Sequence, residues 1–159
     1  MELFKKIPLT QGKFAIVDTE DYERLSAYKW YFQRYGLGLD KGCACRAGVV
    51  NGMRRLIRMH YEIVGYLSVD HINGCGIDNR KVNLRKANKS QNAQNVGLNE
   101  NNTSGYKGVF FDKSIQKFKA RIRNKGVRFY LGNFSTASEA SEAYVKACIK
   151  LHGEFAKWK

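Results

Sequence analysis

The stretch VDHINGCGIDNRKVNLRKANKSQN, residues 69–92, decides the fold of this chain. Asp70 and His71 stand at the end of a short segment of strand character, and a loop rich in Gly and Asn follows. The Asn-Lys-Ser-Gln sequence at 88–91 can cap the helix that presents Asn92. An isolated Asp-His pair is more often structural than catalytic, so the inference depends on the whole set of residues and on its spacing.

These residues resemble the HNH nuclease motif, whose fold is two strands and a helix around one metal ion. The match spans residues 69–96, and both the residue types and their spacings agree. The resemblance implies that His71 is the catalytic general base and that Asp70 and Asn92 are the metal ligands. It also implies that Asn83 ties the connecting loop and so holds His71 in place.

The chemistry of phosphodiester hydrolysis explains why these residue types are needed. A phosphodiester is very inert, so its cleavage needs an activated water and a cation that stabilises the developing charge. An unperturbed imidazole is largely neutral at pH 7 and can accept a proton. The side-chain oxygens of Asp70 and Asn92 favour a hard ion, Mg²⁺ or Mn²⁺. Many family members carry His at these two positions, and some carry a further His where this chain has Val96. We therefore expect poor zinc binding, and weak metal binding without DNA.

Three other residues near the motif have more than one interpretation. Arg80 and Arg85 can clamp DNA phosphates, although a salt bridge to Asp78 explains Arg80 equally well. His60 lies upstream of the motif and is expected to pack in the core or to support the site without touching the substrate.

The net charge of +14 indicates a polyanionic partner, of which nucleic acid is the commonest. Residues 1–96 carry 16 Lys and Arg against 9 Asp and Glu, and residues 97–159 carry 12 against 5. Each part thus has a net charge of +7, and we expect both parts to contact the same polyanion. Charge alone also fits a ribosomal protein or a protein that binds anionic lipid.

The chain before the motif is expected to be rich in β-structure. Phe14–Val17 has strand character, residues 20–30 a short helical pattern, and Leu37 and Leu39 continue an alternating segment. Asn51-Gly52, between two apolar segments, predicts a β-hairpin. The arginines of this hairpin fit contact with DNA and a solvated edge equally well: Arg46, Arg54, Arg55 and Arg58.

The segment after the polar stretch 97–105 has a clear pattern. Residues 117–123 alternate strictly, so the apolar side chains face one way and the Lys and Arg side chains the other. Two further strands are predicted at 106–112 and 127–131, and a capping box at 136–139 starts a helix with one apolar face. The outer face of this sheet then carries four or more cations with no acidic residue among them, which favours nucleic acid over simple solvation.

This C-terminal segment resembles the APETALA/ethylene-response-factor DNA-binding domain, whose three-stranded sheet lies in the major groove. The resemblance covers nearly all of residues 104–156 and is carried by Ser104–Val109, Lys117–Ile122, Tyr130–Phe134, Glu139-Ala140 and Ala143-Tyr144. Phe118 and Phe110 replace a common Trp and a common Arg, so the base preference of the family does not transfer. The residues expected to contact DNA are Lys107, Lys119, Arg121, Arg123, Arg128 and Tyr130.

The expected fold class is α+β. A ββα-metal nuclease core at 69–96 follows an antiparallel β region at 1–68, and a linker at 97–105 leads to a three-stranded antiparallel sheet packed on one helix at 106–159. The four cysteines lack the spacing of a structural zinc site and are expected to be free thiols in the cytoplasm of a bacterium or a phage-infected cell. No apolar run approaches the ~20 residues that span a membrane.

The combination of the two resemblances predicts a site-specific, homing-type endonuclease that acts on double-stranded DNA. One site per chain predicts that a monomer nicks one strand, with no obligate protein partner. The alternative is a sequence-specific DNA-binding regulator with a vestigial nuclease core. A basic RNA-associated or ribosome-associated protein would explain the charge but not the presence of Asp70, His71, Asn83 and Asn92 together.

Overall fold

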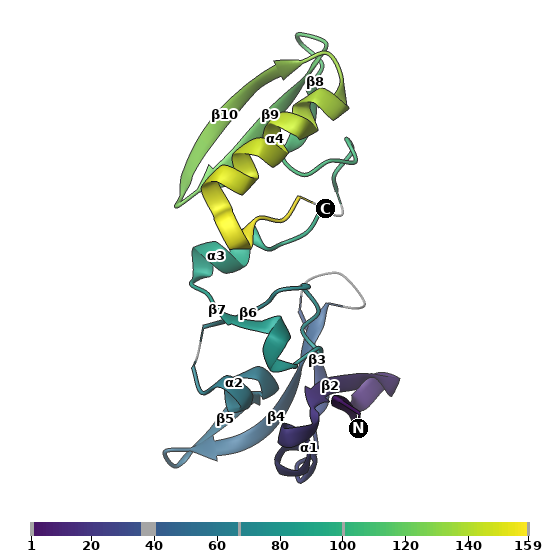
Figure 1. Ribbon diagram of the computed structural model, residues 1–159, viewed down its shortest axis with the longest axis vertical. Helices are drawn as coiled ribbons and strands as arrows, with labels where there is room; N and C mark the ends of the chain where they lie inside the picture. The colour runs from purple at the N-terminus through teal and green to yellow at the C-terminus, as the bar shows by residue number, and fades with distance from the viewer. Residues whose placement is uncertain (1, 36–40, 67, 100, 159) are drawn as a thin grey trace. The chain divides into compact units, whose positions relative to one another are not determined.

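The computed structural model describes residues 2–35, 41–66, 68–99 and 101–158. The chain divides into two compact units, residues 1–87 and residues 88–159, which both contain helices and small antiparallel sheets (Figure 1). This division precedes the third helix, whereas the sequence indicated a boundary within 97–105. In the described ranges, no helix combines the length and the apolar character needed to cross a membrane.

The first unit is built from short elements that pair with their neighbours along the chain. In its described part these are β1 (Phe4–Pro8), η1 (Thr10–Gly12), β2 (Phe14–Asp18), α1 (Thr19–Ser26), β3 (Tyr31–Arg34), β4 (Gly42–Val50), β5 (Met53–Arg58), α2 (Met59–Val64), β6 (Val69–His71), η2 (Lys81–Asn83) and β7 (Leu84–Lys86). The antiparallel sheets are β1–β2, β3–β4–β5 and β6–β7. The strand expected through Leu37 and Leu39 lies outside the described residues.

The sheet β3–β4–β5 has two different faces because side chains alternate along each strand. Phe32 and Ala44 face the hydrophobic core of the unit, where they pack with Leu25 and Trp30. The strand register places Gln33 beside Cys43 and Arg58 beside Cys45 on the opposite face. That second face borders the cavity described below.

Two local predictions for the first unit have different outcomes. The hairpin at Asn51-Gly52 is confirmed, and the two residues have φ of 51° and 75°, as a tight two-residue turn requires. The helix predicted to reach Trp30 ends at Ser26. The Trp30 indole Nε1 donates to the carbonyl oxygen of Leu25 at 2.8 Å, so the buried ring occupies an acceptor of the last helical turn.

The second unit packs one long helix on a three-stranded sheet. Its elements are α3 (Lys89–Gln94), β8 (Val109–Asp112), β9 (Lys117–Asn124), β10 (Val127–Phe134), α4 (Ala137–His152) and η3 (Gly153–Phe155). Both predicted capping boxes are present, at 88–91 and at 136–139. Ile122 on β9 and Tyr144 and Cys148 on α4 form part of the core, so Cys148 is the packing residue that its spacing predicts.

The two faces of the β8–β9–β10 sheet agree with the predicted alternation except at two points. A bulge after Tyr130 interrupts β10, and it lets Leu131 pack on the core while Gly132 pairs with Ala120. The expectation of an outer face without acidic residues is wrong. Asp112, at the end of β8, forms an ion pair with Lys119 on that face.

We predict that Gly108→Ala destabilises the second unit much more than Gly105→Ala. Both glycines have left-handed φ, 72° and 78°, so each substitution costs about 1 kcal/mol of backbone strain. A Cβ at Gly108 would lie 2.2 Å from Cε2 of Tyr144, whereas a Cβ at Gly105 meets no atom within 4 Å. Urea unfolding should show a further loss of about 2 kcal/mol for Gly108→Ala. Equal losses for the two variants would contradict this packing.

Candidate active site

The candidate site is built on the β6–β7 strand pair and on the loop that joins these strands. Asp70 and His71 end β6, and the side chain of Asn83 bonds the loop at two places. Its Oδ1 accepts from the backbone N of Asn73 at 3.0 Å, and its Nδ2 donates to the carbonyl oxygen of Asp78 at 2.7 Å. The fold thus brings Asp70, His71 and Asn83 together, with Asn83 tying the loop.

The imidazole of His71 is oriented by Asn79, a residue to which the sequence gave no role. His71 Nε2 lies 3.1 Å from Oδ1 of Asn79, and Asn79 is completely buried. An amide oxygen only accepts hydrogen bonds, so the neutral imidazole carries its proton on Nε2 and its lone pair on Nδ1. The signal available in the sequence was the Asp-Asn-Arg group at 78–80, but no local pattern links it to His71.

The N-terminal strands support this loop from outside the motif. Asn79 N donates to the carbonyl oxygen of Ile16 at 2.8 Å, and Ile16 N donates to the carbonyl oxygen of Ile77 at 2.8 Å. The backbone N of Lys81 donates to Oδ2 of Asp18 at 2.7 Å. The edge of β2 therefore fixes the part of the loop that holds Asn79 against His71.

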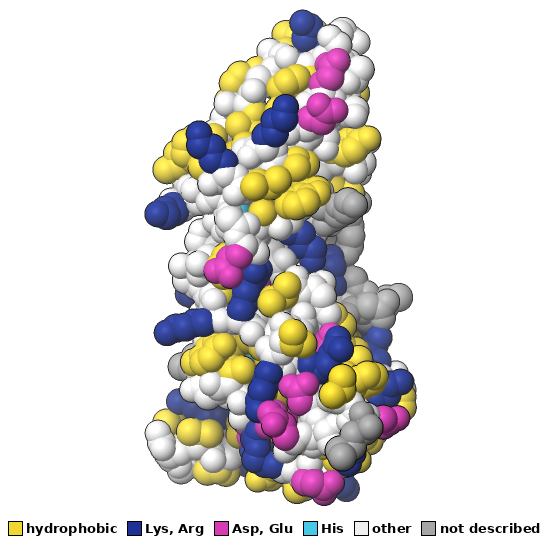
Figure 2. Space-filling model, in the orientation of Figure 1, with side chains coloured by type: hydrophobic (Ala, Val, Ile, Leu, Met, Phe, Trp, Pro, Cys, Tyr) yellow, Lys and Arg dark blue, Asp and Glu magenta, His cyan; other side chains and the backbone are white. Residues whose placement is uncertain are grey.

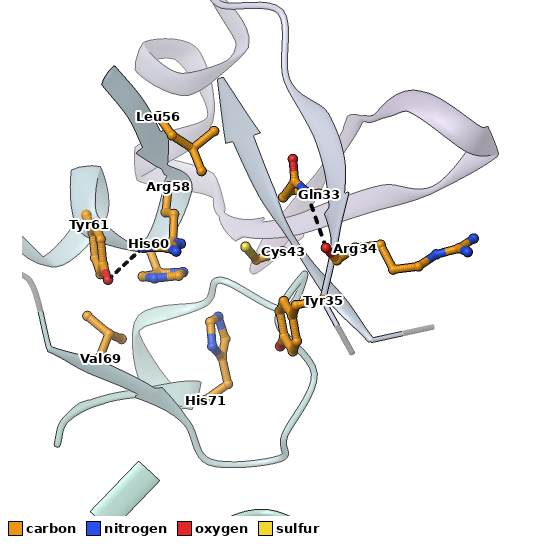
Figure 3. Close-up of a pocket in the computed structure, with 10 residues that line it drawn as sticks. All are labelled: Gln33, Arg34, Tyr35, Cys43, Leu56, Arg58, His60, Tyr61, Val69 and His71. Atoms are coloured by element: carbon orange, nitrogen blue, oxygen red, sulfur yellow. Dashed lines mark hydrogen bonds between the residues drawn. The ribbon is translucent and has the colours of Figure 1, made fainter. Parts of the chain in front are cut away.

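His60 on α2 packs edge-on against the ring of His71 (Figure 3). The ring centroids are 5.0 Å apart, the interplanar angle is 84°, and only 7% of His60 is exposed. Burial, together with the charges of His71 and Arg58, lowers the pKa of His60 to about 3. This packing agrees with the expectation that His60 is a packed or supporting residue.

Burial also lowers the pKa of His71 below its ordinary value, although the hydrogen bond to Asn79 and the charges of Asp70 and Asp78 oppose this shift. The loss of hydration disfavours the charged form of an imidazole. His71 is therefore neutral at physiological pH, which is the state that a general base requires.

A pair of thiols lies on the same side of the sheet as Arg58. Cys43 Sγ is 3.5 Å from Cys45 Sγ, and all four cysteines of the chain are free thiols. The hydrogen bond from Cys45 lowers the pKa of Cys43 to about 7, and the same bond raises the pKa of Cys45. Cys43 borders the cavity beside His71 (Figure 3).

The charged residues of the motif form ion pairs with one another. Arg85 Nε and Nη2 bind Oδ2 of Asp70 at 2.8 and 2.7 Å. Arg80 binds both carboxylate oxygens of Asp78 at 2.8 and 2.7 Å, the second of the two interpretations that the sequence left open. Among the residues that the structure describes, no three His, Cys, Asp or Glu side chains form a group suited to a metal ion.

The remaining candidate residues belong to the second unit. Asn92 lies on α3, half-buried, and its proximity to Asp70 stays a prediction. Lys107 Nζ donates to the carbonyl oxygens of Gln94, Val96 and Lys157. These bonds give Lys107 a structural role within the fold, so we leave it out of the DNA-contacting set.

The outer face of the β8–β9–β10 sheet gathers the other candidates. Arg121 lies over the ring of Phe110, with its guanidinium carbon 4.6 Å from the centroid. Arg123 on β9 and Arg128 on β10 are opposite each other in the strand register. Tyr130 is opposite Arg121 and is 55% exposed. Exposed cations are therefore interleaved with aromatic rings on this face.

Two curated proteins are similar to this chain. An uncharacterized HNH endonuclease of Acanthamoeba polyphaga mimivirus is 28% identical over 152 residues, which are 92% of this chain and 74% of that protein. Protein 3.8 of Escherichia phage T7 is 26% identical over 91 residues, 57% of this chain and 74% of the phage protein. No family model and no solved structure matches the chain. The mimiviral match supports an HNH nuclease; nothing in these matches indicates an APETALA-like C-terminal domain.

The depressed pKa of His60 predicts an acid-sensitive fold. The folded-state pKa of about 3 lies below the ordinary value of 6.5, so the unfolded chain binds the extra proton between these values. The stabilising contribution is complete above pH 6.5 and is lost as the pH falls toward 3, with a slope of about 1.4 kcal/mol per pH unit.

Urea unfolding of wild type and of His60→Leu at pH 6 and at pH 4 isolates this slope. The wild type should lose more stability than the variant over this interval. Identical slopes would mean that His60 is protonated as readily in the folded as in the unfolded chain.

Proposed function

We propose that this chain is a metal-dependent, site-specific HNH endonuclease of the homing type, which hydrolyses phosphodiester bonds in double-stranded DNA. The observation that supports it most is His71, a neutral imidazole whose proton is held on Nε2 by Asn79 at the border of a cavity. The name of the mimiviral relative supports the nuclease family and leaves its substrate open.

In the proposed reaction His71 acts as the general base. Its Nδ1 lone pair takes a proton from a water molecule, the resulting hydroxide attacks the phosphorus, and the bond to the leaving oxygen breaks. Asn79 keeps the imidazole in the required tautomer, and Asn83 holds the loop that carries Asn79 by its two bonds to the loop backbone. Water protonates the leaving oxygen.

Asp70 and Asn92 are proposed to hold a Mg²⁺ or Mn²⁺ ion. The buried carboxylate of Asp70 adjoins His71 and is a hard oxygen donor, so the donor chemistry fits. When bound, such an ion stabilises negative charge on the phosphate and on the leaving oxygen. Arg85 offsets part of the carboxylate charge, so we expect the ion to bind weakly unless a DNA phosphate adds a ligand.

We expect nicking of supercoiled plasmid by the purified monomer with Mg²⁺, and none with EDTA, because one site cuts one strand. His71→Ala should lower the nicking rate at least about 10²-fold without changing DNA affinity, since it removes only the base. Asn79→Ala should also lower the rate, because the imidazole loses its orienting acceptor.

A His71→Ala protein that nicks at the wild-type rate would exclude His71 as the base. A wild-type protein that binds plasmid but never nicks it, with any divalent ion, would identify the chain as a DNA-binding regulator with a vestigial core.

The outer face of the β8–β9–β10 sheet is proposed to grip the DNA duplex. Lys and Arg side chains are spread over the surface of both units that Figure 2 shows. The outer face of the sheet carries a further group of cations on β9 and β10. The cations on β9 and β10 without an acidic partner among the described residues are Lys117, Arg121, Arg123 and Arg128. Arg80 and Arg85 can reach phosphates only by leaving their carboxylate partners.

We predict that residues 88–159 alone bind duplex DNA without cutting it. If the sheet neutralises about 4 phosphates, log K should fall against log salt with a slope near −3.6. Arg123→Ala should make the slope shallower by about 1 if it contacts phosphate, or reduce sequence preference if it reads a base. Lys150→Ala, on the exposed side of α4, is the matched control. Fluorescence anisotropy measures both quantities, and no binding at low salt would show that the face is merely solvated.

A further inference from the structure

The first unit contains a cavity of about 530 Å³ beside His71 (Figure 3). The end of β3, strands β4 and β5, helix α2 and strand β6 border it, and its volume lies within the ~300–1,000 Å³ range of ligand sites. The ten lining residues include two arginines, two histidines and two tyrosines, and no aspartate or glutamate: Gln33, Arg34, Tyr35, Cys43, Leu56, Arg58, His60, Tyr61, Val69 and His71. The two arginines therefore give the lining its positive charge, and the neutral histidines and the tyrosines add hydrogen-bonding groups. The Cys43 thiol, with a pKa of about 7, adds a partly ionised group.

Arg58 is the cation that stands closest to the two histidines in this cavity (Figure 3). Its Nη1 donates to the Tyr61 hydroxyl at 3.2 Å, and the side chain is partly buried. Among the described residues, no carboxylate forms an ion pair with Arg58. The other half-buried arginines that the structure describes in this unit do have one, namely Arg46, Arg80 and Arg85.

The location of Arg58 argues for a ligand. A partly buried cation is costly unless an anion or hydrogen bonds compensate for the lost hydration. Against the effect of burial, the Tyr61 hydroxyl and the thiols of Cys43 and Cys45 raise the pKa of Arg58 above its ordinary value, but they give its planar guanidinium no oxyanion to bind. His60 adds a second polar group. Only 7% of this residue is exposed, and its Nδ1 has no hydrogen-bond partner among the described residues. A guanidinium group matches the oxygens of a phosphate through two parallel hydrogen bonds.

We infer that Arg58 binds a phosphate group of the DNA strand that His71 cuts, within the cavity formed by β3, β4, β5, α2 and β6. This inference rests on the proposed function and adds to it a substrate-binding residue outside the HNH motif. Arg58 holds the phosphate oxygens, and His71 at the border of the same cavity delivers the activated water. The hairpin strand β5, which ends at Arg58, thereby acquires a role in the reaction.

The variant Arg58→Gln and its control Arg55→Gln test the role in cleavage. Arg55 lies on the same strand, is exposed and points to the opposite face, so it matches the charge change. Arg58→Gln should lower kcat/KM for nicking about 10²-fold. Arg55→Gln should stay within about threefold of the wild type. Equal effects of the two variants would overturn the inference.

A second measurement is independent of cleavage. The Nε–Hε signal of Arg58 in a ¹⁵N NMR spectrum is assigned by its absence from the spectrum of Arg58→Gln. Duplex DNA is then titrated into the wild type with EDTA present, and inorganic phosphate is titrated in a separate sample. A saturable shift with duplex alone supports a backbone phosphodiester, and a shift with both supports a general phosphate site.

The signal of Arg58 should move, and that of Arg55 should move much less. An Arg58 signal that stays fixed while other arginine signals shift would overturn the inference, whatever the nicking result. A saturable Arg58 shift in a protein that never nicks DNA would leave the phosphate site intact and refute the proposed nuclease function instead.

Discussion

The side chain of Asn83 closes the loop between β6 and β7, and the geometry around His71 depends on that closure. One amide group accepts from the backbone at Asn73 and donates to the backbone at Asp78. The closed loop places Asn79 against the imidazole of His71. An amide can do this because it carries both a donor and an acceptor, which a carboxylate at the same position lacks.

Burial gives the site its second property, a pair of neutral imidazoles beside a cation. His60 and His71 pack edge-on and are both depleted of water, so each has a pKa below its ordinary value. Arg58 supplies the positive charge near the two rings, and both imidazoles stay neutral. The cavity can therefore attract an anion while His71 keeps the lone pair that base catalysis needs.

The sequence predicted what local patterns control. The capping boxes at 88–91 and 136–139, the hairpin turn at Asn51-Gly52 and the alternation along β9 follow from residue types a few positions apart. The predicted end of α1 was wrong because the buried indole of Trp30 donates a hydrogen bond to the carbonyl oxygen of Leu25. The prediction of a sheet face without acidic residues was wrong because Asp112, on the neighbouring strand, forms an ion pair with Lys119.

The candidate site was predictable only in part, for the same reason. Asp70, His71 and Asn83 belong to one motif, and the fold brings them together. Asn79, whose backbone is held by Ile16, and His60, which comes from α2, meet His71 through tertiary contacts that leave no periodic signal. The pairing of Arg85 with Asp70 was missed because strand register, not spacing, sets it.

The central claim is that DNA is hydrolysed at Asp70 and His71 with the help of a hard divalent ion. Asp70→Asn is the most direct probe, because it preserves the size of the side chain and removes the charge that a cation needs. The measurement is the nicking rate of wild type and variant across a Mg²⁺ titration. The account predicts saturable cleavage for the wild type and no metal-dependent cleavage for the variant; equal rates for both, or cleavage that persists in EDTA, would contradict it.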